Sequence, residues 1–163
     1  KEKHQRRHDI IPPQVKIAGN YTSSMMAKWQ ARKNGYDEII LTDDEGYITE
    51  APTSNVFIVN KDGCLLTAPE DEVLYGITRL SILEIASDEG IDVKIEKIPL
   101  CELENAKEVF LTSSSHLVCP VIKIDNKPIS DGAFGLLTNR LKERFLKISK
   151  GQDIFFSNWL DEV

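Results

Sequence analysis

The sequence lacks the features that secreted, membrane-spanning and zinc-stabilised proteins need. It contains only three cysteines, Cys64, Cys101 and Cys119, and no C-x-x-C pair, so neither a disulfide framework nor a structural zinc site is expected. Its apolar runs, such as residues 56–59, are far shorter than the ~20 residues of a membrane span. No charged and then apolar signal pattern opens the chain. These absences favour a soluble, cytoplasmic protein without a membrane partner.

An excess of positive charge is also absent. The 20 basic and 26 acidic residues give a net charge of -6, which argues against nucleic acid or an anionic membrane as a partner. Four bases and two acids fall within residues 1–9, and we interpret residues 1–10 as a flexible N-terminal edge. His4 and His8 lie four residues apart, but no third ligand accompanies them, so no metal site is predicted. A small-molecule ligand is therefore favoured.

Common nucleotide-binding and hydrolytic motifs are missing as well. There is no phosphate-binding Walker loop, no G-x-G-x-x-G after a strand, no H-E-x-x-H and no G-x-S-x-G. With 163 residues, of which 41% are hydrophobic, the chain has enough material for one globular domain, which we place at residues 11–163.

The spacing of apolar residues predicts a mixture of helices and strands. Helices are expected over residues 21–34, 78–89 and 135–149. Hairpins are expected at residues 38–49 and 55–67, and further strands near residues 92–98, 108–112 and 118–124. On the first helix, Tyr21, Met25, Met26 and Trp29 share a face that we expect to pack in the core. The pattern predicts an α/β (α+β) fold with a mixed, largely antiparallel sheet and flanking helices.

Polar residues at the ends of these elements are candidates for a binding site. Lys16 lies in an apolar stretch, where a lysine must reach water or lose its charge. Glu50 ends a strand, and Thr78 opens a helix, where free N–H groups favour an anion such as phosphate. Thr112 and the serines at 113–115 close another strand, and each of these four hydroxyls can donate to phosphate oxygens. Each residue type also has a purely structural interpretation, as surface lysine, strand end, helix cap or loop.

Short motifs occur in order along nearly the whole chain, from about Ile11 to Val163. They are KIAGNY at 16–21, GYDE at 35–38, GYITE at 46–50, NVF at 55–57, GITR at 76–79, EVFLTS at 108–113 and WL at 159–160. In wording and spacing these motifs resemble the fold-type IV, or class IV, aminotransferases, most of all the branched-chain type. The resemblance implies the C-terminal large domain of the D-amino acid aminotransferase-like fold, a pseudobarrel, without the family's N-terminal domain.

The resemblance further implies a site for pyridoxal 5'-phosphate. Lys16 matches the lysine that forms a Schiff base with the cofactor and then moves a proton at the substrate Cα. Glu50 matches the carboxylate that pairs with the pyridine nitrogen, and Tyr21 matches the tyrosine that bonds the phenolic oxygen. The phosphate would be held by Ile77, Thr78, Ser113 and Ser114. Groups facing the substrate carboxylate would come from Ser114 and Ser115.

Two stretches depart from the family pattern. Residues 51–54 read APTS, where branched-chain enzymes usually have a glycine-rich segment and D-amino acid enzymes a serine-rich one. Pro52 removes a backbone donor near the cofactor. Leu117 replaces a glutamate of most relatives, and the neighbouring His116 is interpreted as bonded to backbone, with substrate contact as the alternative. These departures concern the choice of substrate.

The implied activity is transfer of an amino group from an amino acid, preferably of the branched-chain type, to a 2-oxo acid such as 2-oxoglutarate. A D-amino acid aminotransferase and aminodeoxychorismate lyase are alternatives within the family. An inactive fragment is another, because the N-terminal domain that brings a phosphate-binding arginine has no counterpart here. Family members are commonly dimers, so a homodimer is expected. The sequence does not identify the amino donor.

Overall fold

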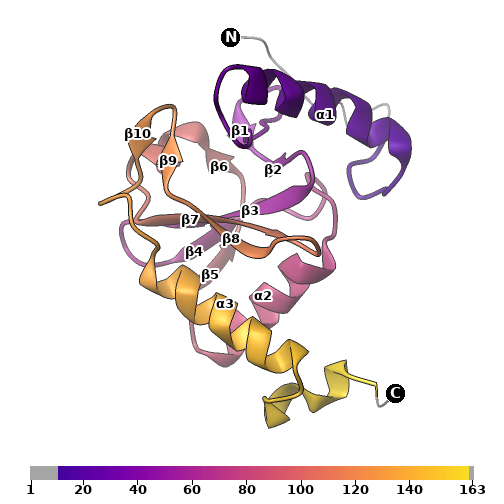
Figure 1. Cartoon of the computed structure of the whole chain (residues 1–163), viewed down its shortest axis with the longest axis vertical. Coiled ribbons are helices and arrows are strands. Elements are labelled where there is room, and N and C mark those ends of the chain that lie inside the picture. The colour runs from indigo at the N-terminus through magenta and orange to yellow at the C-terminus, as the bar shows by residue number, and fades with distance from the viewer. Residues whose placement is uncertain (1–10, 162–163) are drawn as a thin grey trace.

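The computed structural model describes residues 11–161, so the predicted flexible edge at residues 1–10 lies outside the described residues. A six-stranded sheet forms the centre (Figure 1). Its strand order is β5 (Val93–Ile95), β4 (Leu65–Thr67), β3 (Ser54–Val59), β7 (Glu108–Ser113) and β8 (Leu117–Val121), and β2 (Glu50–Ala51) also pairs with β3. All pairings are antiparallel except β4 with β5. The predicted mixed, largely antiparallel sheet is confirmed.

Strand β3 is buried along its whole length because both faces of the sheet are covered. Side chains alternate between the faces, so Val56 and Ile58 enter one apolar cluster while Phe57 and Val59 enter the other. Phe57 stacks on Phe110 of β7, with the ring centroids 5.0 Å apart. The continuous apolar run at residues 56–59 therefore contributes side chains to both apolar clusters.

Helices α2 (Ile77–Asp88) and α3 (Leu136–Ser149) cover one face of the sheet (Figure 1). Both helices were predicted, and their side chains Ile82, Ile85 and Leu141 are fully buried against the sheet. Among residues 11–161, no helix combines the length and apolar character required to cross a membrane.

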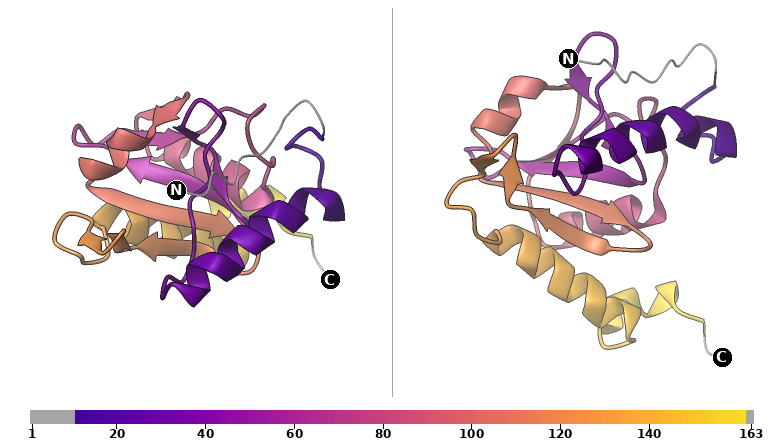
Figure 2. Two further views of the ribbon diagram at one scale, coloured as in Figure 1. Left: turned by 90° about the horizontal axis from the view of Figure 1, so that it is seen from above. Right: turned by 45° about the horizontal axis from the view of Figure 1, so that its top comes forward.

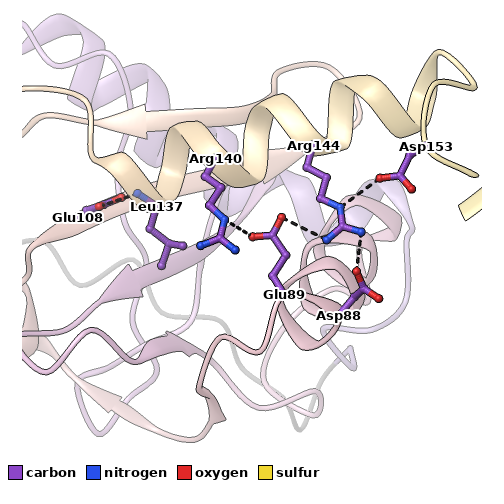
Figure 3. Close-up of polar contacts among 7 residues, drawn as sticks. All are labelled: Asp88, Glu89, Glu108, Leu137, Arg140, Arg144 and Asp153. Atoms are coloured by element: carbon purple, nitrogen blue, oxygen red, sulfur yellow. Dashed lines mark hydrogen bonds and ion pairs between the residues drawn. The ribbon is translucent and has the colours of Figure 1, made fainter. Parts of the chain in front are cut away.

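Charged side chains fasten α3 to its neighbours (Figure 3). The carboxylate of Glu108 on β7 accepts the backbone N–H groups of Leu137 and Thr138 at 3.0 and 2.7 Å, and so caps the helix. At the other end, Arg144 pairs with Asp88 and Glu89 at the end of α2. The position of α3 on the sheet therefore depends on long-range ion pairs as well as on apolar packing.

The opposite face of the sheet is covered by short elements. They are the pair β1 (Tyr47–Ile48) with β6 (Ile98–Pro99), the pair β9 (Lys123–Ile124) with β10 (Lys127–Pro128), and the 3-10 helix η1 (Leu100–Glu104). The hairpin predicted at residues 38–49 is present, since the Leu41 N–H donates to the Glu50 carbonyl oxygen at 2.8 Å and the Thr49 N–H donates to the Leu41 carbonyl oxygen at 3.0 Å. Strand β1 also pairs with β6. The segment that contains β1 thus has a local partner on one side and a long-range partner on the other.

Helix α1 (Ala18–Lys33) lies on the opposite side of the sheet from α3 (Figures 1 and 2). The prediction that Met25, Met26 and Trp29 pack in the core is wrong, since they are 45%, 61% and 56% exposed. The buried face consists of Ser24, Ala27, Lys28 and Ala31. Small side chains let the helix lie close to its support, and a criterion based on apolar size does not find such a face. The 3-10 helix η2 (Ile154–Trp159) near the end was not predicted.

Candidate active site

A cavity of about 270 Å³ lies where several strand and helix ends meet. Its walls come from four stretches of chain, within residues 14–21, 50–55, 74–78 and 112–114. Of the residues predicted for the site, the cavity brings together Lys16, Tyr21, Glu50, Ile77, Thr78, Ser113 and Ser114. Ser115 is not among the lining residues. Segments distant in sequence thus converge on the residues that the motifs single out.

The rim of the cavity, formed by Lys16 and Tyr21, belongs to the chain entering α1. Lys16 is the central residue of a tight turn in which the Ile17 N–H donates to the Val15 carbonyl oxygen at 3.0 Å. The side-chain amide of Asn20 donates to the carbonyl oxygens of Pro12 at 3.1 Å and Val15 at 2.7 Å. These short-range bonds hold the lysine at the cavity edge.

Lys16 itself is exposed, which corrects the expectation of an apolar environment. The reason is that its apolar neighbours Val15 and Ile17 are themselves 41% and 44% exposed and do not cover it. Within residues 11–21, the cavity wall is formed by Lys16, Gln14 and Tyr21, which lies in the first turn of α1. Within residues 11–161, burial of the lysine therefore requires a ligand or further protein.

The floor of the cavity, formed by Glu50, Asn55 and Thr112, belongs to the central sheet, and these side chains are 3%, 4% and 1% exposed. Glu50 accepts the Leu74 N–H at 3.2 Å, and the Asn55 amide approaches the same carboxylate oxygen at 3.5 Å. Asn55 also donates to the Leu74 carbonyl oxygen at 2.9 Å. A buried carboxylate needs such donors, and they fix its direction.

Segment 68–76, which carries Leu74, is also held by hydrogen bonds at its start. The fully buried Arg79 donates from Nη2 to the carbonyl oxygen of Ala68 at 2.9 Å. Burial lowers the pKa of the Arg79 guanidinium, against the opposing effect of Glu70. The side chain of Gln14 donates to the Glu70 carbonyl oxygen at 3.3 Å, which joins the segment to the rim. The segment therefore links the two sides of the cavity.

The end of this segment approaches the floor so closely that only glycine fits. A Cβ atom at Gly76 would overlap the side-chain oxygen of Asn55. The φ angle of Gly76 is -69°, which any residue can adopt. The requirement for glycine is therefore steric, and it comes from the neighbouring amide rather than from the backbone.

The start of α2 has the properties of an anion site. Gly76 is its N-cap residue, no side chain caps the free N–H groups, and no acidic residue lies in the first turn. Ile77 and Thr78 open the helix and line the cavity, as do Ser113 and Ser114 at the end of β7. Uncapped amides, a positive helix dipole end and hydroxyl donors together favour a phosphate group.

The turn after β7 differs from what was predicted for it. Ser115 bonds the Nδ1 atom of His116 at 2.9 Å and lies 3.2 Å from the Ser113 hydroxyl, oxygen to oxygen. The interpretation of His116 as bonded to backbone is therefore wrong, because its ring contacts side-chain hydroxyls. Leu117, where β8 begins, has a φ angle of +56°, an unusual conformation for this residue type. The proposed role of Ser115 at the substrate stays a prediction.

Pro52 and Thr53 form the two-residue turn between Ala51 and Ser54, and both line the cavity. A proline suits the first central position of such a turn. The turn therefore explains why a proline is tolerated at position 52, where the sequence departs from the family pattern.

Asn20 and Asn55 contribute to the site although no role was predicted for them, whereas Thr112 was predicted only as one of four hydroxyls able to donate to a phosphate. Asn20 and Asn55 both lie within the recognised motifs, and an amide directly before the apolar run of β3 is a signal that could have been used. Among residues 11–161, no group of three or more potential ligands is placed to hold a metal ion.

Comparison with known proteins identifies the family. Residues 1–124 match the model of the class IV amino-transferases, and the chain belongs to that family. It is 36% identical over 162 residues to a probable branched-chain-amino-acid aminotransferase of Aquifex aeolicus, with 97% of the chain and 52% of the relative covered. The family and the fold expected from the motifs are thereby confirmed.

Solved structures give the same result. The branched-chain amino acid aminotransferase of Thermobaculum terrenum, solved in its PLP-bound holo-form, superimposes with a TM-score of 0.91 at 30% identity, covering 96% of the chain and 52% of that protein. The Escherichia coli enzyme has a TM-score of 0.93 at 33% identity, with 99% and 54% covered. The chain thus spans about half the length of the relatives it matches.

Proposed function

We propose that the chain supplies the cofactor-binding half of a pyridoxal 5'-phosphate-dependent aminotransferase. The main support for this proposal is that one cavity is lined by Lys16, Tyr21, Glu50 and Thr78 together with Ser113 and Ser114 at the end of β7. Relatives named branched-chain-amino-acid aminotransferases, one of them solved in its PLP-bound form, support the assignment.

The residues present fit this cofactor on independent grounds. The uncapped start of α2 suits its phosphate, and the buried Glu50 carboxylate suits a protonated ring nitrogen. The buried hydroxyl of Thr112 lacks a partner among residues 11–161, as expected of a wall that a polar ligand completes. When bound, pyridoxal 5'-phosphate supplies an aldehyde that condenses with amines and a ring that accepts electrons.

Each side chain then has a definite task. Nζ of Lys16 would hold the cofactor and, once freed, would move a proton between the substrate Cα and the C4' atom of the cofactor. Glu50 keeps the ring nitrogen protonated, and the Leu74 N–H and the Asn55 amide keep that carboxylate in place. The Tyr21 hydroxyl donates to the phenolic oxygen. Ile77, Thr78, Ser113 and Ser114 hold the phosphate through N–H and O–H groups.

For the substrates, we propose a branched-chain amino acid as donor and a 2-oxo acid such as 2-oxoglutarate as acceptor, with Ser114 and Ser115 facing the carboxylate. The names of the relatives support this choice over a D-amino acid aminotransferase or aminodeoxychorismate lyase. The test compares L-leucine, D-alanine and aminodeoxychorismate as substrates of the full-length protein. We expect turnover with L-leucine, and turnover with only one of the others would refute the proposed substrate class.

We also propose a homodimer in the cytoplasm. The exposed apolar side chains Met25, Met26 and Trp29 on α1 support the presence of further covering protein. Cys64, Cys101 and Cys119 are all free, which supports a reducing compartment. Light scattering of the full-length protein measures the number of subunits, and a monomer would refute the dimer.

A further inference from the structure

Thr112 lies in the cavity floor, where its side chain is buried. The residue is 1% exposed and lines the cavity, and its Oγ1 atom has no hydrogen-bond partner among residues 11–161. Buried hydroxyl groups are nearly always paired, because an unpaired one loses its bonds to water without replacement. The unpaired hydroxyl therefore marks a place where an atom of a ligand belongs.

The geometry of the sheet shows which way this hydroxyl faces. Thr112 on β7 lies directly opposite Asn55 on β3, so the two side chains share one face of the sheet. On the same face, two residues earlier along β7, Phe110 packs in the cluster that includes residues of α2. Ile77 and Thr78 at the start of that helix line the same cavity. Thr112 thus faces the cavity from beneath the helix start.

We propose that the Thr112 hydroxyl donates a hydrogen bond to the phosphate group of the bound cofactor, a contact that rests on the proposed function. The first turn of α2 carries no acidic residue and has no side-chain cap, so its N–H groups remain available to an anion. Ser113, the next residue on β7, already bonds Ser115 and accepts the His116 N–H. Thr112 differs from Ser113 in that its hydroxyl is uncommitted. The Thr112 hydroxyl is therefore available on β7 to donate a hydrogen bond to the phosphate.

The test removes the hydroxyl and keeps the shape, in Thr112→Val of the full-length protein. Titration with pyridoxal 5'-phosphate, followed by absorbance, should show about tenfold weaker binding, the effect of one lost charge-assisted hydrogen bond. Titration with pyridoxal, which carries the same ring and aldehyde without the phosphate, should show no change. Thr112→Ser, which keeps the hydroxyl, should restore most of the affinity for pyridoxal 5'-phosphate.

Thr67→Val is the matched control. Thr67 is also 1% exposed and lies in the same sheet, but its hydroxyl donates to the Val56 carbonyl oxygen at 2.8 Å and it does not line the cavity. This variant should keep the affinity for both ligands and lose thermal stability. Without ligand, Thr112→Val should instead unfold at the wild-type temperature or about 2–4 °C higher, because no bond is broken.

Equal affinity of Thr112→Val and wild type for pyridoxal 5'-phosphate would overturn the inference. So would an equal loss of affinity for pyridoxal, because the contact would then lie on the ring. Failure of the wild-type protein to bind pyridoxal 5'-phosphate is a separate result, which would refute the proposed function and the inference with it.

Discussion

The floor and the rim of the cavity are built in different ways. Glu50, Asn55 and Thr112 of the floor come from three strands of the central sheet and are almost fully buried. Lys16 and Tyr21 of the rim come from a loop and the first turn of α1, and the lysine is exposed. The floor depends on the fold as a whole, whereas the rim depends on a few short-range hydrogen bonds.

Because of this difference, substitutions at the rim and at the floor should affect the free energy of unfolding differently. A rim residue can be changed with little effect on the free energy of unfolding, since exposed side chains contribute little to it. A floor residue lies among packed neighbours, so a replacement that changes its volume or breaks its hydrogen bonds affects folding and function together. Lys16, the proposed attachment point, therefore belongs to the part of the site that is easiest to alter.

The largest effect is expected at the rim. Lys16→Ala should abolish the visible absorbance of bound cofactor and lower turnover by about 10³-fold or more, because both the attachment point and the proton carrier are lost. Its unfolding midpoint should match that of the wild type. Lys61→Ala, an exposed lysine in the turn after β3, is the control. An unchanged absorbance spectrum would exclude Lys16 as the attachment point.

The next largest effect is expected at the floor. Glu50→Gln should retain the cofactor but lower turnover on the order of 10²-fold, because the ring nitrogen would lose its anionic partner. Steady-state kinetics and cofactor absorbance measure the two quantities separately. Glu84→Gln, an exposed acid on α2, serves as the control. Near-normal turnover of Glu50→Gln would remove this residue from its proposed role.

Gly76→Ala tests how tightly the floor is packed. The added methyl group would overlap the Asn55 side chain, so we expect a loss of about 1–3 kcal/mol in the free energy of unfolding together with weaker cofactor binding. Chemical denaturation measures the first quantity. The matched control is Gly19→Ala, whose added Cβ would lie 3.3 Å from the flexible end of Ile11. If Gly76→Ala is as stable as wild type, the floor is looser than described.

The smallest effect is expected from the residue that supports the rim. Asn20→Ala removes two hydrogen bonds to the carbonyl oxygens of Pro12 and Val15, which precede Lys16, and we expect a loss of about 1 kcal/mol or less in stability, since these bonds are exposed. Cofactor attachment should be slower, because the lysine is no longer held at the cavity edge. Stopped-flow absorbance measures this rate, and an unchanged rate would show that Asn20 does not position Lys16.

Local pattern was sufficient for much of the fold. Short apolar runs bounded by turn residues predicted β3 and β7, and helical spacing predicted α2 and α3, because these elements bury large apolar side chains. The same criterion placed Met25 and Trp29 in the core and was wrong, since α1 rests on Ser24 and Ala27. Pairings between distant segments, such as β1 with β6 and β4 with β5, leave no local mark and were not predicted.

The site shows the same division. Lys16, Glu50 and Thr78 were identified because their motifs resemble a family, and the cavity gathers them. The supporting contacts were not identified, since the bond of Leu74 to Glu50 and the close approach of Gly76 to Asn55 join residues about 20 positions apart in sequence. Contacts of this kind depend on the folded sheet.

Reductive trapping tests the central claim most directly. The full-length protein is loaded with pyridoxal 5'-phosphate, reduced with borohydride and digested, and the labelled peptide is sequenced. The label should lie on Lys16. A label on any other lysine, with Lys16 unmodified, would contradict the account.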